Sequence, residues 1–145
     1  MGYRISPHFS VNSMTDSDPR STFTCLAKGL EHLGIGYVHL VEAIGGRLGE
    51  TDPAARLAPV IREIYQGTLI LNGGYEALTG NEAVRTGYAD LISFGVPFLA
   101  NPDLPLRFKT GAPLNSADIA TFYDGETHGY TDYPPLYRGV ADNSS

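Results

Sequence analysis

The sequence has few of the residues on which secreted, membrane-spanning and nucleic-acid-binding proteins depend. Its 145 residues include one cysteine, Cys25, so no disulfide and no thiolate metal site can form within the chain. No apolar run approaches the length that spans a bilayer, and we expect no signal peptide at the N-terminus. Ten basic residues stand against 16 acidic ones, which gives a net charge of −6. The composition therefore argues against nucleic-acid and membrane partners and favours a cytoplasmic protein.

Hydrophobic residues make up 42% of the chain and charged residues 18%, which is an ordinary globular balance. The length suits one domain of average size. Cys25 lies within a helical apolar pattern, so we expect a small buried side chain there.

Short apolar strands alternate with amphipathic helices along the chain. Strands are predicted at residues 3–6, 37–41, 69–71 and 91–94. Helices are predicted from Asp18-Pro19 to Leu33, from Asp52-Pro53 to Gln66, at 81–86 and at 101–109, because each proline-containing start provides a cap. Strict alternation of this kind predicts an α/β fold with a parallel sheet. A complete (β/α)₈ barrel takes about 250 residues, so four units make either half of such a barrel or a small open sheet.

Two of these strands run directly into glycine, at Leu71-Asn72-Gly73-Gly74 and at Phe94-Gly95. Glycine lets backbone N–H groups approach an anion without interference from a Cβ, and a following helix adds its positive N-terminal dipole. The pattern predicts a phosphate cradle. The alternative is that these are ordinary turn glycines. The G-x-G-x-x-G spacing of a dinucleotide-binding turn is not present, which argues against a Rossmann fold.

Six segments together resemble the Old Yellow Enzyme family of FMN-dependent NAD(P)H oxidoreductases, which includes N-ethylmaleimide reductase and oxophytodienoate reductase. They are residues 3–7 (YRISP), 37–42 (YVHLVE), 71–75 (LNGGY), 94–104 (FGVPFLANPDL), 121–123 (TFY) and 129–134 (GYTDYP). The resemblance implies the C-terminal half of a TIM (β/α)₈ barrel, strands 5 to 8. Residues 1–110 would form this half-barrel, and residues 111–145 an irregular tail packed on it.

The resemblance also implies roles for individual residues. Arg4 would reach the pyrimidine edge of the flavin, where a fixed cation stabilises negative charge; otherwise it is a surface arginine. Phe122 and Tyr123 would line the substrate pocket, and otherwise only anchor the tail. The implied cofactor-binding residues are Arg4, Asn72, Gly73, Gly74, Gly95, Val96 and Tyr123.

Position 96 departs from the family pattern, in which an arginine commonly follows the glycine of strand 8 and pairs with the phosphate. Val96 can offer only its N–H, so FMN affinity should be weaker unless Arg107 or Lys109 substitutes. The alternative is that both of these side chains are solvated.

Of the other polar residues, His39 is predicted to be a hydrogen-bonded core residue, and Glu42 to play a supporting role at a strand end.

Asp16 and Asp18 resemble half of a cation-binding loop, but helix capping explains them better, and no metal site is predicted. In the family, hydride passes from NAD(P)H to FMN and then to a small electrophilic alkene such as an enone or a maleimide. No residue of this chain matches the family's carbonyl-polarising histidine or its proton-donating tyrosine, so we assign no catalytic residue and expect little turnover from the chain alone.

Unpaired sheet edges favour a homodimer or a complementary N-terminal half-barrel as partner. Two alternatives stay open, namely a non-catalytic phosphate-binding or assembly module and a truncated, inactive fragment.

Overall fold

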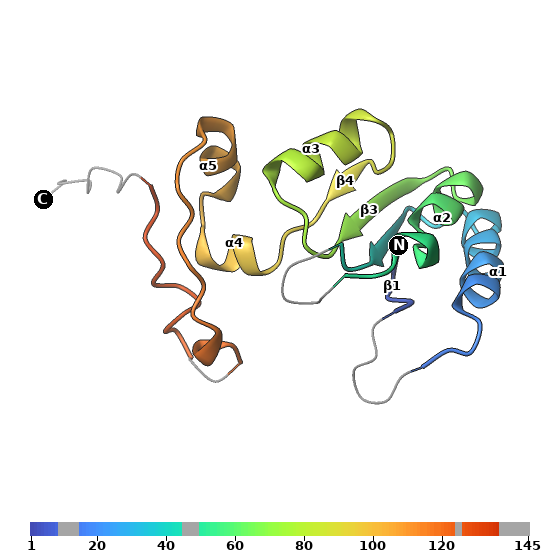
Figure 1. Cartoon of the computed structure of the whole chain (residues 1–145), viewed down its shortest axis with the longest axis horizontal. Coiled ribbons are helices and arrows are strands. Elements are labelled where there is room, and N and C mark those ends of the chain that lie inside the picture. The colour runs from blue at the N-terminus through green and yellow to red at the C-terminus, as the bar shows by residue number, and fades with distance from the viewer. Residues whose placement is uncertain (9–14, 45–49, 124–125, 137–145) are drawn as a thin grey trace, which may run out of the picture. The chain divides into compact units, whose positions relative to one another are not determined.

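The computed structural model of the chain describes residues 1–8, 15–44, 50–123 and 126–136. It forms two compact units, residues 1–93 (unit 1) and residues 94–145 (unit 2), which Figure 1 colours blue to yellow and yellow to red. The domain boundary predicted after residue 110 stays a prediction.

Unit 1 contains a sheet of four parallel strands in the order β1-β2-β3-β4. The strands are β1 (Gly2–Ile5), β2 (Tyr37–Val41), β3 (Thr68–Asn72) and β4 (Leu91–Ile92). The helical elements of unit 1 are α1 (Pro19–His32), the 3₁₀ turn η3 (Pro53–Ala55), α2 (Ala58–Ile64) and α3 (Ala77–Arg85). The predicted α/β fold with four parallel strands is confirmed, although β4 is shorter than the predicted strand at 91–94.

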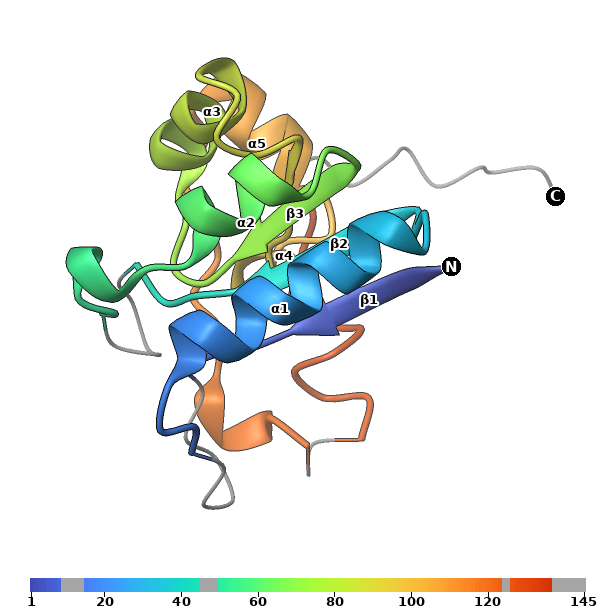
Figure 2. The same ribbon diagram turned by 90° about the vertical axis from the view of Figure 1, so that its right-hand side faces the viewer.

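The two faces of the sheet differ in character. Alternate strand residues point to the same face, and Val38, Leu40 and Leu69 on one face are completely buried. Figure 2 shows α1 and α2 lying against the sheet, and these helices add the buried side chains of Leu30 and Ile61. The opposite face therefore has no cover from α1 or α2.

Helix α1 begins as predicted. The side chain of Asp18 accepts a hydrogen bond from the Ser21 N–H at 3.1 Å, and Pro19 opens the helix. The prediction for Cys25 is wrong, because its side chain is exposed. Ala27 and Leu30 face the core, and a residue two positions before Ala27 lies on the far side of the helix.

The helix predicted from Asp52 to Gln66 is in fact two elements. Asp52 caps only η3, through the Ala54 N–H at 2.9 Å. The chain then becomes extended at Arg56 (φ −62°, ψ 136°) before α2 begins with a proline in its first turn. Pro59 has no N–H to donate, which is tolerated in the first turn of a helix but not in its interior, so it suits the start of α2 and not the middle of one long helix. The predicted helix at 81–86 begins earlier, at Ala77, where Glu76 and Thr79 form a capping box.

Unit 2 contains α4 (Val96–Ala100), α5 (Leu104–Thr110) and the 3₁₀ turn η4 (Ile119–Thr121). Helix α4 was not predicted, and α5 corresponds to the predicted helix at 101–109. The rings of Phe94 and Phe108 pack edge to face with their centroids 5.1 Å apart. Among the helices in the described ranges, none is both long enough and apolar enough to cross a membrane.

Candidate functional site

The carboxyl ends of β2 and β3 are joined by their backbones. Glu42 donates its N–H to the Asn72 carbonyl at 3.0 Å, and Ile44 donates to the Gly73 carbonyl at 2.7 Å. A Cβ on Gly73 would lie 2.2 Å from the Glu42 carbonyl oxygen, and the residue has φ +126°. Gly73 is therefore required by backbone packing, whether or not a ligand binds. Gly74, at φ +84°, is exposed beside it.

Arg4 and His39 are neighbours on the sheet face that α1 and α2 leave uncovered. They are register partners between β1 and β2, so their side chains leave the sheet on the same side. Arg4 is exposed. Within the described ranges its guanidinium has no hydrogen bond and no ion pair, and it interacts with His39 only through its charge.

His39 is linked to Asn72 through Ser93, which is the residue that bonds to its ring. The Asn72 amide donates to the Ser93 carbonyl at 2.8 Å and to the Ser93 hydroxyl at 2.9 Å, and that hydroxyl lies 2.8 Å from His39 Nε2. His39 is hydrogen-bonded as predicted, but half-buried. Burial, and then the positive charge of Arg4, lower the pKa of His39 below its usual value.

Glu42 has a structural role that the sequence only partly indicated. Its buried carboxylate accepts hydrogen bonds from the backbone N–H groups of Leu57 at 2.5 Å and Ala58 at 3.0 Å, and lies 3.4 Å from His8 Nε2. It caps α2 from 15 residues away along the chain. The usable signal was an acidic residue directly after a buried strand, together with a helix start that lacks a local cap.

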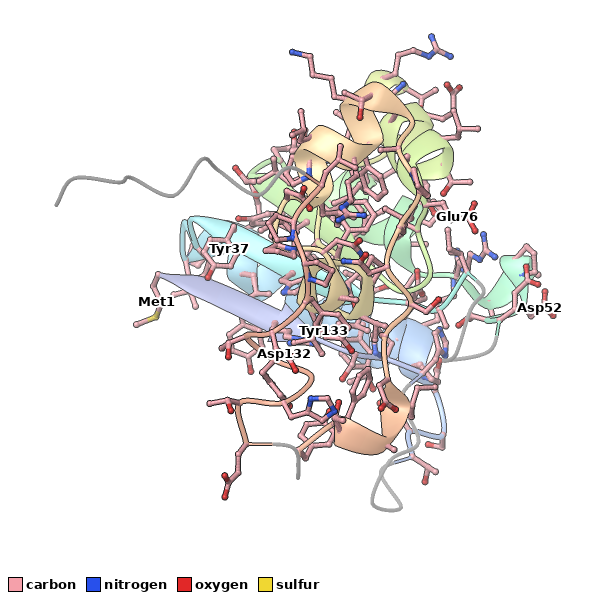
Figure 3. The ribbon with its side chains drawn as sticks, turned by 90° about the vertical axis from the view of Figure 1, so that its left-hand side faces the viewer. Met1, Tyr37, Asp52, Glu76, Asp132 and Tyr133 are labelled. Atoms are coloured by element: carbon pink, nitrogen blue, oxygen red, sulfur yellow. The ribbon has the colours of Figure 1, made fainter. Side chains whose placement is uncertain are left out.

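Two hollows of about 310 and 370 Å³ flank the carboxyl ends of these strands. The smaller is lined by residues that include His8, Glu50 and Asp52, and the larger by residues that include Tyr75 and Tyr88. Burial raises the pKa of Tyr75 to about 12, so its hydroxyl stays protonated. In Figure 3, Asp52 marks the carboxyl-end side of unit 1, whereas Tyr37 lies beside Met1 at the other end of the sheet.

In unit 2, Gly95 directly precedes α4, and a Cβ added to it would meet nothing within 4 Å. Val96 is the first residue of that helix and is 41% exposed. Arg107 is neither solvated nor free to replace the missing arginine, because its side chain is buried. It donates to Asp103 at 2.7 Å and to the Pro113 and Pro134 carbonyls at 2.6 and 2.9 Å.

The aromatic pair predicted to line the pocket lies in the tail of unit 2. The Phe122 and Tyr123 rings are edge to face at 6.5 Å, and Tyr123 is 91% exposed with φ +72°. The Tyr123 N–H donates to the Tyr130 hydroxyl at 3.1 Å. Asp132, labelled in Figure 3, lies 2.6 Å from His128 and accepts the Gly129 N–H at 2.8 Å. The hydrogen bonds of this segment hold the tail in a local fold.

The predicted site residues are thus divided between the units. Unit 1 holds Arg4 on β1, and it holds Asn72, Gly73 and Gly74 at the carboxyl end of β3, with β2 between the two strands. Unit 2 holds Gly95, Val96, Phe122 and Tyr123. Across the part of the chain that the structure describes, no three His, Cys, Asp or Glu side chains are grouped so as to hold a metal ion.

Comparison with known proteins gives consistent matches. The model of the NADH:flavin oxidoreductase / NADH oxidase family matches residues 1–115. Putative 12-oxophytodienoate reductase 12 of Oryza sativa subsp. japonica is 46% identical over 143 residues, which cover 93% of this chain and 35% of the relative.

Solved structures agree. The old yellow enzyme homologue from Zymomonas mobilis is 41% identical, with a TM-score of 0.84 over 92% of this chain and 38% of that protein. Morphinone reductase in complex with tetrahydroNAD is 37% identical, with a TM-score of 0.82 over 95% of this chain and 36% of that protein. The chain thus spans little more than a third of the length of each of these three relatives.

Proposed function

Since the chain belongs to the NADH:flavin oxidoreductase / NADH oxidase family, that of Old Yellow Enzyme, we propose that it supplies a flavin-binding portion of an ene-reductase site. The four strands would be strands 5 to 8 of the barrel. The observation that carries the proposal is the guanidinium of Arg4, which is exposed and without a hydrogen bond or ion pair among the described residues, on the uncovered face of the sheet.

The residues of unit 1 fit FMN in part. Arg4 is a permanent cation, and no hydrogen bond to another described residue occupies the donors that it could offer to the carbonyl oxygens of a pyrimidine ring. Gly74 is exposed and has no Cβ, so an anion can approach its backbone. Asn72 is less available, because its amide nitrogen already donates to two acceptors of Ser93. Its remaining group for a ligand is the side-chain oxygen, which accepts and does not donate.

Bound FMN would supply hydride transfer from NAD(P)H to an electrophilic alkene. The residues of this chain would bind and orient it: Arg4 at the ring, and the N–H groups of Gly74, Gly95 and Val96 at the phosphate. Phe122 and Tyr123 remain the substrate-pocket candidates, and a cytoplasmic location remains our expectation. Because the chain spans little more than a third of each compared relative, the reaction of the whole enzyme is part of the proposal and is not assigned to this chain alone.

The test is titration of the purified chain with FMN and with riboflavin, followed by flavin fluorescence. Arg4→Gln should weaken both ligands by about tenfold or more, because each loses a hydrogen bond to a charged group. Gly95→Ala should weaken FMN and leave riboflavin unchanged, because only FMN carries the phosphate. An alanine at position 95 has open space around it and an ordinary φ of −88°, so the fold should tolerate it.

Arg20→Gln is the matched control, since Arg20 is exposed on α1, which lies against the face of the sheet opposite to that of Arg4 (Figure 2). No binding of either flavin at millimolar concentration would refute the proposal for this chain. Equal affinities of Arg4→Gln and Arg20→Gln would refute the role of Arg4.

A second candidate function is an assembly module. Among the described residues, strands β1 and β4 each have one neighbour in the sheet, so both edges present backbone groups to a further parallel strand. A second copy of the chain or a complementary half-barrel would pair there. Sizing chromatography separates the two functions, because a stable dimer that binds no flavin favours the module.

A further inference from the structure

Arg4 and His39 form a polar pair whose consequences go beyond flavin binding itself. Their backbones pair directly between β1 and β2, and both side chains lie on the face that α1 and α2 leave uncovered. The same row continues with Ile70 on β3 and Leu91 on β4, which are apolar. An ion that binds the guanidinium therefore acts at close range on the imidazole, with no charged side chain between them in the row.

The hydrogen-bond partner of His39 suits both protonation states of the ring. The Ser93 hydroxyl oxygen accepts one hydrogen bond from Asn72, which leaves its own hydrogen and a second lone pair for His39 Nε2. A neutral ring accepts the serine hydrogen at Nε2. A protonated ring donates to the serine oxygen instead. His39 can therefore gain a proton by rotation of one hydroxyl hydrogen, without moving a heavy atom.

Few charged groups among the described residues can shift the pKa of this imidazole. Apart from Arg4, the residue that faces it across the row is Ile70. Ser93 bonds to it, Asn72 bonds to that serine, and the titratable residue nearest on its own strand is Tyr37. None of them is charged at neutral pH. Among the described residues, Arg4 is the one charged group whose field shifts the pKa of His39, and it acts together with burial to lower that pKa.

We propose that His39 takes up a proton when an anionic ligand binds against Arg4, so that the two residues respond as one unit to negative charge. An anion at the guanidinium offsets the field that disfavours the imidazolium. The ligand class is a planar ring that carries delocalised negative charge, and two-electron-reduced FMN is the example that follows if the proposed function is correct. Proton uptake makes the binding of such a ligand tighter as the pH falls, by up to about tenfold per pH unit.

The experiment is an NMR titration of the histidine ring signals in the full chain, with His39→Gln used to assign the signal of residue 39. In the free chain, Arg4→Gln should move the titration midpoint of His39 to higher pH, and Arg20→Gln should leave it unchanged. Saturation with FMN reduced by dithionite under argon should also move it to higher pH. Oxidised FMN, whose ring is neutral, should move it less.

An unchanged midpoint in Arg4→Gln would overturn the coupling without reference to any flavin. An unchanged midpoint with reduced FMN bound, as judged by absorbance, would overturn the response to the ligand. Failure of FMN to bind at all would refute the proposed function and the flavin as ligand, and the free-chain comparison would still decide whether Arg4 controls His39.

Discussion

Gly73→Ala should destabilise unit 1 more than any other glycine-to-alanine change at the strand ends. The added Cβ would lie 2.2 Å from the Glu42 carbonyl oxygen and 3.0 Å from the Ala43 Cα. Both are backbone atoms, and the hydrogen bond from Ile44 to Gly73 holds them in place. The methyl group cannot be accommodated by rotating a side chain, so the ends of β2 and β3 have to separate.

Two terms set the size of the effect. A non-glycine residue at φ +126° costs about 1–3 kcal/mol in backbone strain. Overpacking against fixed neighbours adds about 1–3 kcal/mol. We expect a total loss of about 3 kcal/mol in the free energy of unfolding, measured by urea denaturation with far-UV circular dichroism.

Two other glycines separate these terms. Gly87 has φ +75° and open space around its Cβ position, so Gly87→Ala reports strain alone, about 1–2 kcal/mol. Gly29 lies inside α1 with open space and no positive φ, so Gly29→Ala should stabilise by about 0.5–1 kcal/mol. If Gly73→Ala costs no more than Gly87→Ala, the packing argument is wrong.

Four further changes test other parts of the structure. Glu42→Gln should lower the free energy of unfolding by about 1–3 kcal/mol, because an amide can satisfy only one of the two N–H groups at the start of α2. Glu63→Gln, on the exposed side of that helix, should have little effect. Arg107→Met should cost about 3 kcal/mol and raise hydrogen exchange over residues 113–136, and Lys109→Met should do neither. The hydrogen bond from Arg107 lowers the pKa of Asp103 below its ordinary value of 3.8. The wild type should therefore be more stable than Asp103→Asn at pH values above 3.8, and this difference should vanish as the pH falls through the lowered pKa. Urea unfolding at a series of pH values measures it. Val96→Arg should tighten FMN by about tenfold or more by restoring a cation at the phosphate, while Phe98→Arg on the same helix leaves affinity unchanged; equal affinities of the two variants would count against the phosphate position.

The fold was predictable where a single local signal decides the structure. The alternation of apolar strands and helical stripes predicted the parallel sheet, and Asp18-Pro19 predicted the start of α1. Long-range contacts explain the failures. The cap of α2 is Glu42, 15 residues away, and no local pattern reveals such a partner. Cys25 has an apolar side chain, but its angular position on α1 turns it away from the core.

The same reasoning applies to the site. The segments that resemble the family identified the family correctly, and they were local. The role of Gly73 could not be predicted from its local sequence. A glycine is required there because the backbone at the end of another strand passes against it. The burial of Arg107 could not be predicted from the sequence either, since two of its hydrogen-bond partners are carbonyl groups of the tail. Both cases needed the three-dimensional neighbours of the residue.

The central claim is that this chain binds FMN through strand-end residues, and backbone NMR during an FMN titration tests it most directly. We predict that the largest amide shift changes fall on Arg4, Gly74, Gly95 and Val96, with riboflavin reproducing the change at Arg4 only. Changes confined to the hollow beside Tyr75 and Tyr88, or the absence of any change at saturating FMN, would contradict the account.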